Sequence, residues 1–232
     1  VNNFNLSSCT NLYCLFQNCT SLTTLDLSGL DTSNIEGMYG MFHMCRNLQT
    51  ITGLETWDVS KVKSFTLMFG ECNALTEINL PPTNFNGNSI TMGRFALNTS
   101  LTTLDLTPWT NVKVTEVNSF LDTSSVTSFD VSTIDASVPN ISYFLKNSTT
   151  LQEFKFFKSL KFTDLANTNP FTNFSLSGCT NLSKASIVNF LKVLPDISSS
   201  RKSYAIPLGD TNKAKLTSSE IAIATNKGYT VA

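Results

Sequence analysis

A short apolar phrase, spaced apolar-x-x-apolar-x-apolar, recurs along the chain at a nearly constant interval. Its copies begin at residues 22, 48, 75, 101, 126 and 151, so that neighbouring copies are 25 to 27 residues apart. One such unit cannot bury its apolar side alone, and stacking on its neighbours hides that side. The period therefore predicts a solenoid. The residues expected to form one internal column are Leu25, Ile51, Ile78, Leu104 and Phe129.

Two other positions of the period repeat as well. An aromatic residue lies six or seven residues before each phrase, at Phe16, Phe42, Phe69, Phe95, Phe120 and Phe144. A Cys or small polar residue lies about three residues before each phrase, at Cys19, Cys45, Cys72, Asn98, Thr123 and Ser148. Free Cys packs as a small hydrophobe, so we expect a ladder of buried thiols. A disulfide from Cys14 to Cys9 or Cys19 is the alternative, because spacing does not decide it.

Composition limits the classes of partner. Of the 232 residues, 41% are hydrophobic and only 14% are charged, with a formal net charge of −1. The chain can bury a substantial core, and it shows no basic patch for nucleic acid or an anionic membrane. No apolar stretch reaches the roughly 18 to 20 residues of a membrane helix. The start Val-Asn-Asn-Phe has neither initiator Met nor signal-peptide layout, as expected of an excised or processed piece.

Each phrase is expected to form a short parallel strand. Its apolar residues point inward and the residues between them point outward. Six such strands would form one ladder roughly 24 Å long, while the other side of each turn is expected to be mostly loop and short helix. The outward face supplies the candidate ligand-binding residues, which are Thr24, Asp26, Thr50, Thr52, Thr76, Glu77, Asn79, Thr102, Thr103, Asp105, Ser128 and Asp130.

The repeat pattern ends after Leu182. Before that point, residues 163–174 carry a loop insertion, which in solenoids often lies on a binding face. After it, we expect a helix capped by Ser183, a strand at residues 204–208, and a second helix opened by the capping box of Thr217 and Glu220 and stopped at Gly228. We therefore divide the chain into a repeat domain, residues 1–182, and a small α+β cap, residues 183–232.

The sequence offers little catalytic chemistry. Its one His, His43, lies inside a repeated element where the next copy has Gly70, which indicates an ordinary surface or turn residue. Asp105 and Asp130 should be neighbours and could gather calcium, but like charges at adjacent positions are more often solvated than metal-bound. We expect no enzyme activity, no metal and no cofactor. Trp57 and Trp109 are expected to pack in the core, with a ligand platform as the alternative.

Residues 25–35, 41–48 and 57–75 resemble the BspA-like leucine-rich repeats of bacterial surface proteins, although later copies lack the Cys. Residues 212–232 resemble the closing segment of such proteins and of bacteriophage tail-associated proteins. The resemblance implies an α/β leucine-rich repeat fold that presents an exported, non-catalytic binding surface. Fold carries over more safely than ligand, because function belongs to the site.

Two functional hypotheses follow from the resemblance. The first is an extracellular adhesion module on a bacterial cell surface, which recognises a host or bacterial surface protein or glycan. The second is a structural or receptor-binding part of a phage tail, located on the virion and assembled as a homo-oligomer, commonly threefold. Hydroxyls and amides on a rigid face suit polar partners, but aromatic platforms for sugars are scarce on the predicted face. A protein partner and a glycan therefore stay equally open.

Overall fold

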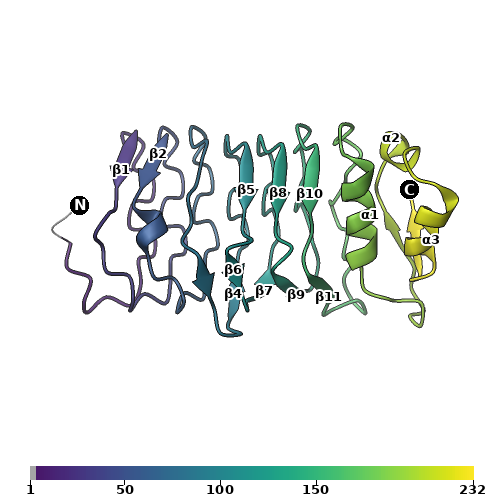
Figure 1. Cartoon of the computed structure of the whole chain (residues 1–232), viewed down its shortest axis with the longest axis horizontal. Coiled ribbons are helices and arrows are strands. Elements are labelled where there is room, and N and C mark those ends of the chain that lie inside the picture. The colour runs from purple at the N-terminus through teal and green to yellow at the C-terminus, as the bar shows by residue number, and fades with distance from the viewer. Residues whose placement is uncertain (1–3) are drawn as a thin grey trace.

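The computed structural model describes residues 4–232 as an elongated row of stacked chain turns (Figure 1). The first described residues lie at one end of the row and the helices gather at the other. Every pair of strands in the described residues is parallel. Among the regular elements of residues 4–232, short parallel strands thus predominate over helices, in agreement with the repeat pattern.

The apolar phrases form a first ladder of strands along one side of the row. Its strands are β1 (Thr24–Asp26), β2 (Thr50–Thr52), β5 (Thr103–Asp105), β8 (Ser128–Asp130) and β10 (Glu153–Lys155). Leu25 pairs with Ile51, and Phe129 pairs with both Leu104 and Phe154. The central residue of each strand is buried and its neighbours are more exposed. The predicted inward and outward faces are confirmed for these five copies.

The third copy of the phrase departs from the prediction. Its residues 76–80 form no strand, so the first ladder is split into the pair β1–β2 and the triplet β5–β8–β10. No backbone hydrogen bond of the described structure involves residues 76–80, and Ile78 is only half-buried. The expected single ladder of six strands, with Ile78 paired in its column, is therefore wrong. We call residues 76–80 the interruption.

Local sequence on both sides of the interruption explains it. Pro81 and Pro82 follow it directly, and proline has no N–H to donate to a neighbouring strand. In the preceding turn, Gly53 adopts a left-handed conformation with φ 89° and leads into the 3-10 helix η1 (Leu54–Thr56). A Cβ on Gly53 would lie 2.3 Å from Ser28 N, so this close approach requires glycine. The chain is turned away from strand pairing before and after the interruption.

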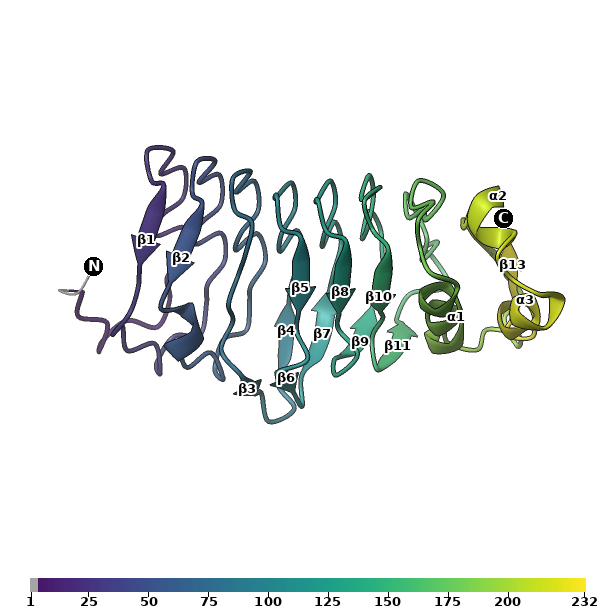
Figure 2. The same ribbon diagram turned by 45° about the horizontal axis from the view of Figure 1, so that its top comes forward.

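A second ladder runs along another side of the row (Figure 2). It contains β4 (Ser89–Thr91), β7 (Lys113–Glu116), β9 (Asp135–Val138) and β11 (Ser159–Phe162). Single bridges extend it from Thr91 through Ser64 and Gly37 to Asn11. A short pair, β3 (Thr83–Asn84) with β6 (Trp109–Thr110), lies between the two ladders in the chain order. The expectation of mostly loop and short helix on this side is wrong, because stacked turns pair their backbone groups here as well.

The turns that precede the phrases also satisfy their backbone groups in a regular way. In residues 14–19, even-numbered N–H groups donate to the next turn, as Asn18 N does to His43 O at 2.8 Å. The N–H groups of the odd-numbered residues donate to the carbonyl oxygen three residues earlier in the same turn, as Cys19 N does to Phe16 O at 3.2 Å. Left-handed residues four apart, such as Cys14 and Asn18, make this alternation geometrically accessible. The same pattern recurs in the following turns, so the backbone is paired without helices.

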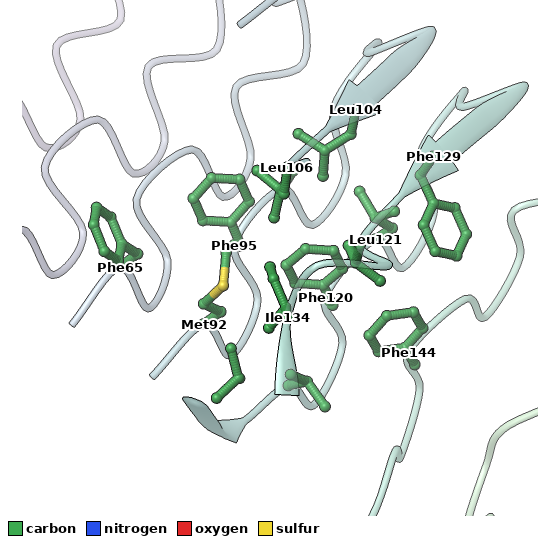
Figure 3. Packing of buried hydrophobic residues seen from close by; sticks show 14 of the residues in the cluster. Phe65, Met92, Phe95, Leu104, Leu106, Phe120, Leu121, Phe129, Ile134 and Phe144 are labelled. Carbon is green, nitrogen blue, oxygen red and sulfur yellow. The ribbon is translucent and has the colours of Figure 1, made fainter. Parts of the chain in front are cut away.

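Aromatic rings form a column through the core. Phe42 stacks on Phe16 and Phe69, and Phe120 stacks on Phe95 and Phe144, with interplanar angles of 1° to 15°. Figure 3 shows Phe95, Phe120 and Phe144 following one another between the strands. The repeated aromatic position is therefore part of the core.

The column of small residues is also internal, with one change of register. Cys45 Sγ donates to Phe16 O at 2.9 Å, and Cys72 Sγ donates to Phe42 O at 3.0 Å. In the next two turns the buried counterparts are Thr99 and Ser124, each bonded to a backbone carbonyl. The assignment to Asn98 and Thr123 is therefore wrong by one residue, because those two adopt the left-handed conformation that precedes the buried slot.

The cysteines and tryptophans have the packing roles expected of them. All six thiols are free, and Cys45, Cys72 and Cys179 are buried, whereas Cys9, Cys14 and Cys19 are partly buried. Burial raises the pKa of Cys179 to about 11. Trp57 and Trp109 are buried, and the Trp109 indole N–H donates to Pro81 O at 3.1 Å. Both tryptophans therefore belong to the core.

The C-terminal segment covers the last strand of the first ladder. It contains α1 (Lys184–Val193), β12 (Tyr204–Ile206), α2 (Asp210–Lys213), α3 (Ser218–Thr225) and β13 (Tyr229–Val231). The Ser183 cap and the capping box of Thr217 and Glu220 are confirmed, while α2 was not anticipated. Ser186 Oγ and Asn189 Oδ1 on α1 accept hydrogen bonds from Phe154 N and Phe156 N, at 2.8 and 3.0 Å. Side chains of α1 thereby replace a further strand.

The insertion lies next to this C-terminal segment. Its extra residues fall between Thr163, whose N–H bonds to Val138 O, and Pro170, whose carbonyl accepts from Ile141 N. Tyr204 Oη donates to Leu165 O at 2.6 Å, and the Lys202 ammonium contacts Ala166 O. These contacts give the insertion a packing role against residues 202–204.

Candidate functional site

The outward face of the first ladder carries polar side chains on a backbone held by parallel pairing. The residues on either side of each buried strand centre are exposed on β1, β2 and β5 and partly exposed on β8. Five of these eight residues are Thr or Ser, whose hydroxyls both donate and accept hydrogen bonds, and the other three are Asp. Since the backbone beneath them is paired, these groups hold fixed positions, except at the interruption.

A hollow of about 760 Å³ lies at the interruption, between β2 and β5. We define the hollow by its lining residues, which are Ile51, Thr52, Glu55, Thr76, Glu77, Ile78, Asn79, Leu80, Thr102, Thr103, Asp105 and Pro108. Its volume is within the usual range of ligand sites. The hollow exists because residues 76–80 do not form the strand that would continue the ladder.

Apolar groups contribute to the lining of the hollow. Ile78 and Leu80 are half-buried, although their counterparts Leu104 and Leu106 in the next copy are buried. Pro108 is exposed at the same site. These side chains still present apolar area that a partner can cover, at roughly 25 cal/mol per Å² removed from water.

Three carboxylates also line the hollow, and local hydrogen bonds orient each of them. Glu77 Oε1 accepts from Asn79 Nδ2 at 2.9 Å, and Asp105 Oδ1 accepts from Thr107 N at 2.8 Å. Glu55 Oε2 accepts from Gly53 N at 3.1 Å. Among residues 4–232, the ion pairs include none of these three carboxylates. None of the three is therefore neutralised by a direct ion pair, although the Lys155 ammonium lies close enough to Asp105 for their opposite charges to interact.

A shallower depression of about 300 Å³ follows along β5, β8 and β10. Here the Lys155 ammonium lies 3.0 Å from Asp130 Oδ2. Partial burial opposes ionisation of Asp130, but hydrogen bonds from Ser132 and the Lys155 charge outweigh it and hold its pKa below the usual range. Because Lys155 already neutralises Asp130, the calcium alternative at Asp105 and Asp130 has little support. In the described part of the chain, no cluster of three His, Cys, Asp or Glu side chains could hold a metal.

The predicted site residues divide into three groups. Those that line the hollow are Thr52, Thr76, Glu77, Asn79, Thr102, Thr103 and Asp105. Ser128 and Asp130 line the shallower depression, together with Thr103 and Asp105. Thr24, Asp26 and Thr50 lie on β1 and β2 and line neither. The structure thus brings most of the predicted residues together at one place.

Sequence reasoning missed the apolar and turn residues of the hollow, above all Glu55, Leu80 and Pro108. Two signals could have located it. The second copy of the phrase is stretched by one residue before Leu54, and the third is followed by two prolines. Both indicate that strand pairing is disturbed between these copies.

His43 is placed apart from the hollow. Its Nδ1 lies 3.2 Å from Gln17 Nε2, and partial burial lowers its pKa from the usual value. An amide partner is neither a nucleophile nor a carboxylate that would orient a general base. No helix formed by residues 4–232 has the length and apolarity needed to cross a bilayer.

Short parallel strands stacked at the period of the apolar phrase define a leucine-rich-repeat-like fold. A family described as "Mycoplasma protein of unknown function, DUF285" matches residues 1–92. A crystal structure of a leucine-rich repeat protein from Bacteroides ovatus is similar over 86% of this chain, with 16% identity and a TM-score of 0.41. The chain covers 46% of the length of that protein. No curated protein matches the sequence.

Proposed function

We propose that this protein is a non-catalytic binding module: a leucine-rich repeat solenoid, residues 1–182, closed by the cap of residues 183–232. It binds a protein partner through the outward face of the first ladder, with the hollow at the centre of the contact. The observation that carries this proposal is the hollow itself. It lies on the polar face chosen from the sequence, and its lining combines half-buried apolar groups with exposed hydroxyls and carboxylates.

The energetics of such a site fit protein recognition. Each hydrogen bond to a hydroxyl or amide contributes about 0.5 to 1.5 kcal/mol, and covering Ile78, Leu80 and Pro108 adds an apolar contribution. Binding costs less when the surface is already ordered. Paired strands on both sides of the hollow, β1–β2 and β5–β8–β10, provide that order.

The lining of the hollow favours a protein over a glycan. None of the described lining residues is aromatic, and aromatic rings offer the amphipathic platforms that sugars commonly stack on. The exposed large hydrophobic side chains, Phe4, Tyr13, Leu15 and Tyr39, lie in the first two turns of the row instead. A glycan partner therefore ranks second.

The biological setting that we propose is an extracellular one, on a bacterial cell surface, where the module mediates adhesion to a surface protein. It rests on the resemblance of residues 25–35, 41–48 and 57–75 to bacterial surface repeats. The runner-up is a virion tail, for which residues 212–232 supply the resemblance. The two differ in assembly, because a tail protein is expected to form a homo-oligomer. Light scattering of the purified chain distinguishes them, since a stable trimer favours the tail.

Binding arrays test the proposed site. Purified bacterial surface and host extracellular proteins are arrayed beside a glycan array, and each hit is retested against a variant carrying Thr102→Trp and Thr103→Trp. The matched control carries Ser199→Trp and Thr230→Trp, which are exposed in the C-terminal segment and lie outside that face. We expect protein hits whose affinity falls at least tenfold in the first variant only, with circular dichroism unchanged. Equal affinity for both variants would place the site elsewhere, and glycan hits alone would overturn the protein assignment.

A further inference from the structure

We infer that the hollow accommodates an extended, basic peptide segment of the protein partner. This inference rests on the proposed protein-binding function and specifies the chemistry of the partner. Three independent properties of the site support it: the charge of the face, the unpaired backbone of the interruption, and the apolar groups in the lining.

The face is acidic although the chain as a whole is nearly neutral. The formal net charge of the protein is only −1. The outward positions of the first ladder and the interruption nevertheless hold Asp26, Glu77, Asp105, Asp130 and Glu153 against a single cation, Lys155. Lys155 is paired with Asp130, and Glu55 adds a further carboxylate to the hollow. Apart from Lys155, the basic side chains lie outside these outward positions, and the hollow complements a cationic partner.

The interruption offers unpaired backbone groups at the same place. No backbone hydrogen bond of the described structure involves residues 76–80. On either side, β2 is paired only with β1, and β5 only with β8. Partners commonly bind such exposed backbone by adding an extended strand, in which main-chain hydrogen bonds supply affinity. A folded helix could not use these groups, because its own backbone is already bonded internally.

The mixed lining matches the alternation of an extended peptide. Successive side chains of a strand point to opposite sides, so that residues i and i+2 share a face and lie about 7 Å apart. One set can cover Ile78 and Leu80, while the other reaches Glu55, Glu77 or Asp105. The expected binding motif is therefore Arg or Lys alternating with apolar residues. Arg is favoured because its planar fork binds a carboxylate with two parallel hydrogen bonds.

A peptide-display selection tests this inference. A random dodecapeptide library is selected on the immobilised protein, and enriched peptides are synthesised and titrated by fluorescence anisotropy. The test variant carries Glu55→Gln, Glu77→Gln and Asp105→Asn. The charge-matched control carries Asp31→Asn, Asp58→Asn and Asp196→Asn, whose side chains accept from Ser33 N, Ser60 N and Ser198 N, bonds that an amide oxygen preserves.

We expect enriched peptides to alternate Arg or Lys with apolar residues. Their affinity should fall at least tenfold in the test variant, stay within twofold in the control, and weaken on raising the salt from 50 to 300 mM. The amide resonances of residues 76–80 should shift on binding. Peptides that bind the two variants equally, or that carry no basic residues, would overturn the inference. If such neutral peptides still shift residues 76–80, protein binding at the hollow stands and only the basic partner is refuted.

Discussion

The rings of Phe69 and Phe95 meet edge to face, with centroids 5.4 Å apart and an angle of 85° between their planes. The other successive pairs of this column lie nearly parallel. The backbone hydrogen bonding also changes between Phe69 and Phe95. Phe42 N donates to Met68 O, which belongs to the residue before the next Phe of the column. Phe69 N instead donates to the oxygen of the next Phe itself, Phe95 O. The aromatic column therefore shifts by one backbone position next to the interruption. Core packing and the surface hollow change together between the third and fourth copies.

The first prediction concerns this column. Phe69→Ala should lower the free energy of unfolding by about 3–5 kcal/mol, because a fully buried ring is lost between two neighbours and leaves a cavity. Phe16→Ala is the matched control, since Phe16 is only partly buried at the end of the column and stacks on Phe42 alone. Urea denaturation measures both. An equal loss in the two variants would contradict the role assigned to the internal stack.

The second prediction concerns the small buried column. Cys72→Ser should change the free energy of unfolding by about 1 kcal/mol or less, because a hydroxyl can also donate to Phe42 O, as Ser148 Oγ does to Leu121 O at 2.7 Å. Cys72→Leu should cost about 1–3 kcal/mol, since the slot is fully buried and has no room for a larger side chain. Thermal unfolding of the two variants tests the ranking. A Leu variant as stable as the Ser variant would mean that the column is loosely packed.

The third prediction concerns the end of the first ladder. Replacing Ser186 by Ala and Asn189 by Leu removes the acceptors of Phe154 N and Phe156 N. Each unsatisfied donor should cost about 1–3 kcal/mol, and exchange of both amides with deuterium should accelerate. The exposed Lys192, replaced by Ala, serves as the control on the same helix. If both amides exchange at the wild-type rate in the double variant, the side chains of Ser186 and Asn189 do not protect the end of the first ladder. Newly exposed strand edges should also promote self-association, visible by light scattering.

The fourth prediction concerns acid stability. A backbone hydrogen bond from Thr217 and the Lys184 ammonium lower the pKa of Glu220 from 4.5 to about 2. A carboxyl group with a lowered folded-state pKa stabilises the fold above its unfolded pKa, and this contribution disappears as the pH falls towards the folded value. The free energy of unfolding should therefore decrease between about pH 4.5 and 2. In Glu220→Gln this decrease should be smaller, as measured by urea titrations across that range. An unchanged acid profile in the variant would rule out a contribution from Glu220.

The order of the repeats, the inward and outward faces of the strands and the two longer helices of the C-terminal segment, α1 and α3, could be predicted from the chain alone. Leu25, Ile51, Leu104 and Phe129 are buried as expected, and Ser183 caps a helix. These features depend on side-chain periodicity and on capping within a few residues. Interactions between residues close together in the chain determine these features, and such interactions can be predicted from the sequence.

The second ladder, the split of the first ladder and the register of the small buried column could not be predicted in this way. Each depends on which backbone groups of one turn face those of the next, some 25 residues away. Gly53 and Pro81 carry local information about turning, but whether residues 76–80 pair depends on the positions of β2 and β5.

The sequence by itself therefore determined that this protein stacks short apolar strands under a polar face. Only the tertiary structure decided where that face opens into a hollow and which carboxylates gather there, because strand pairing is a contact between distant segments rather than a property of either one.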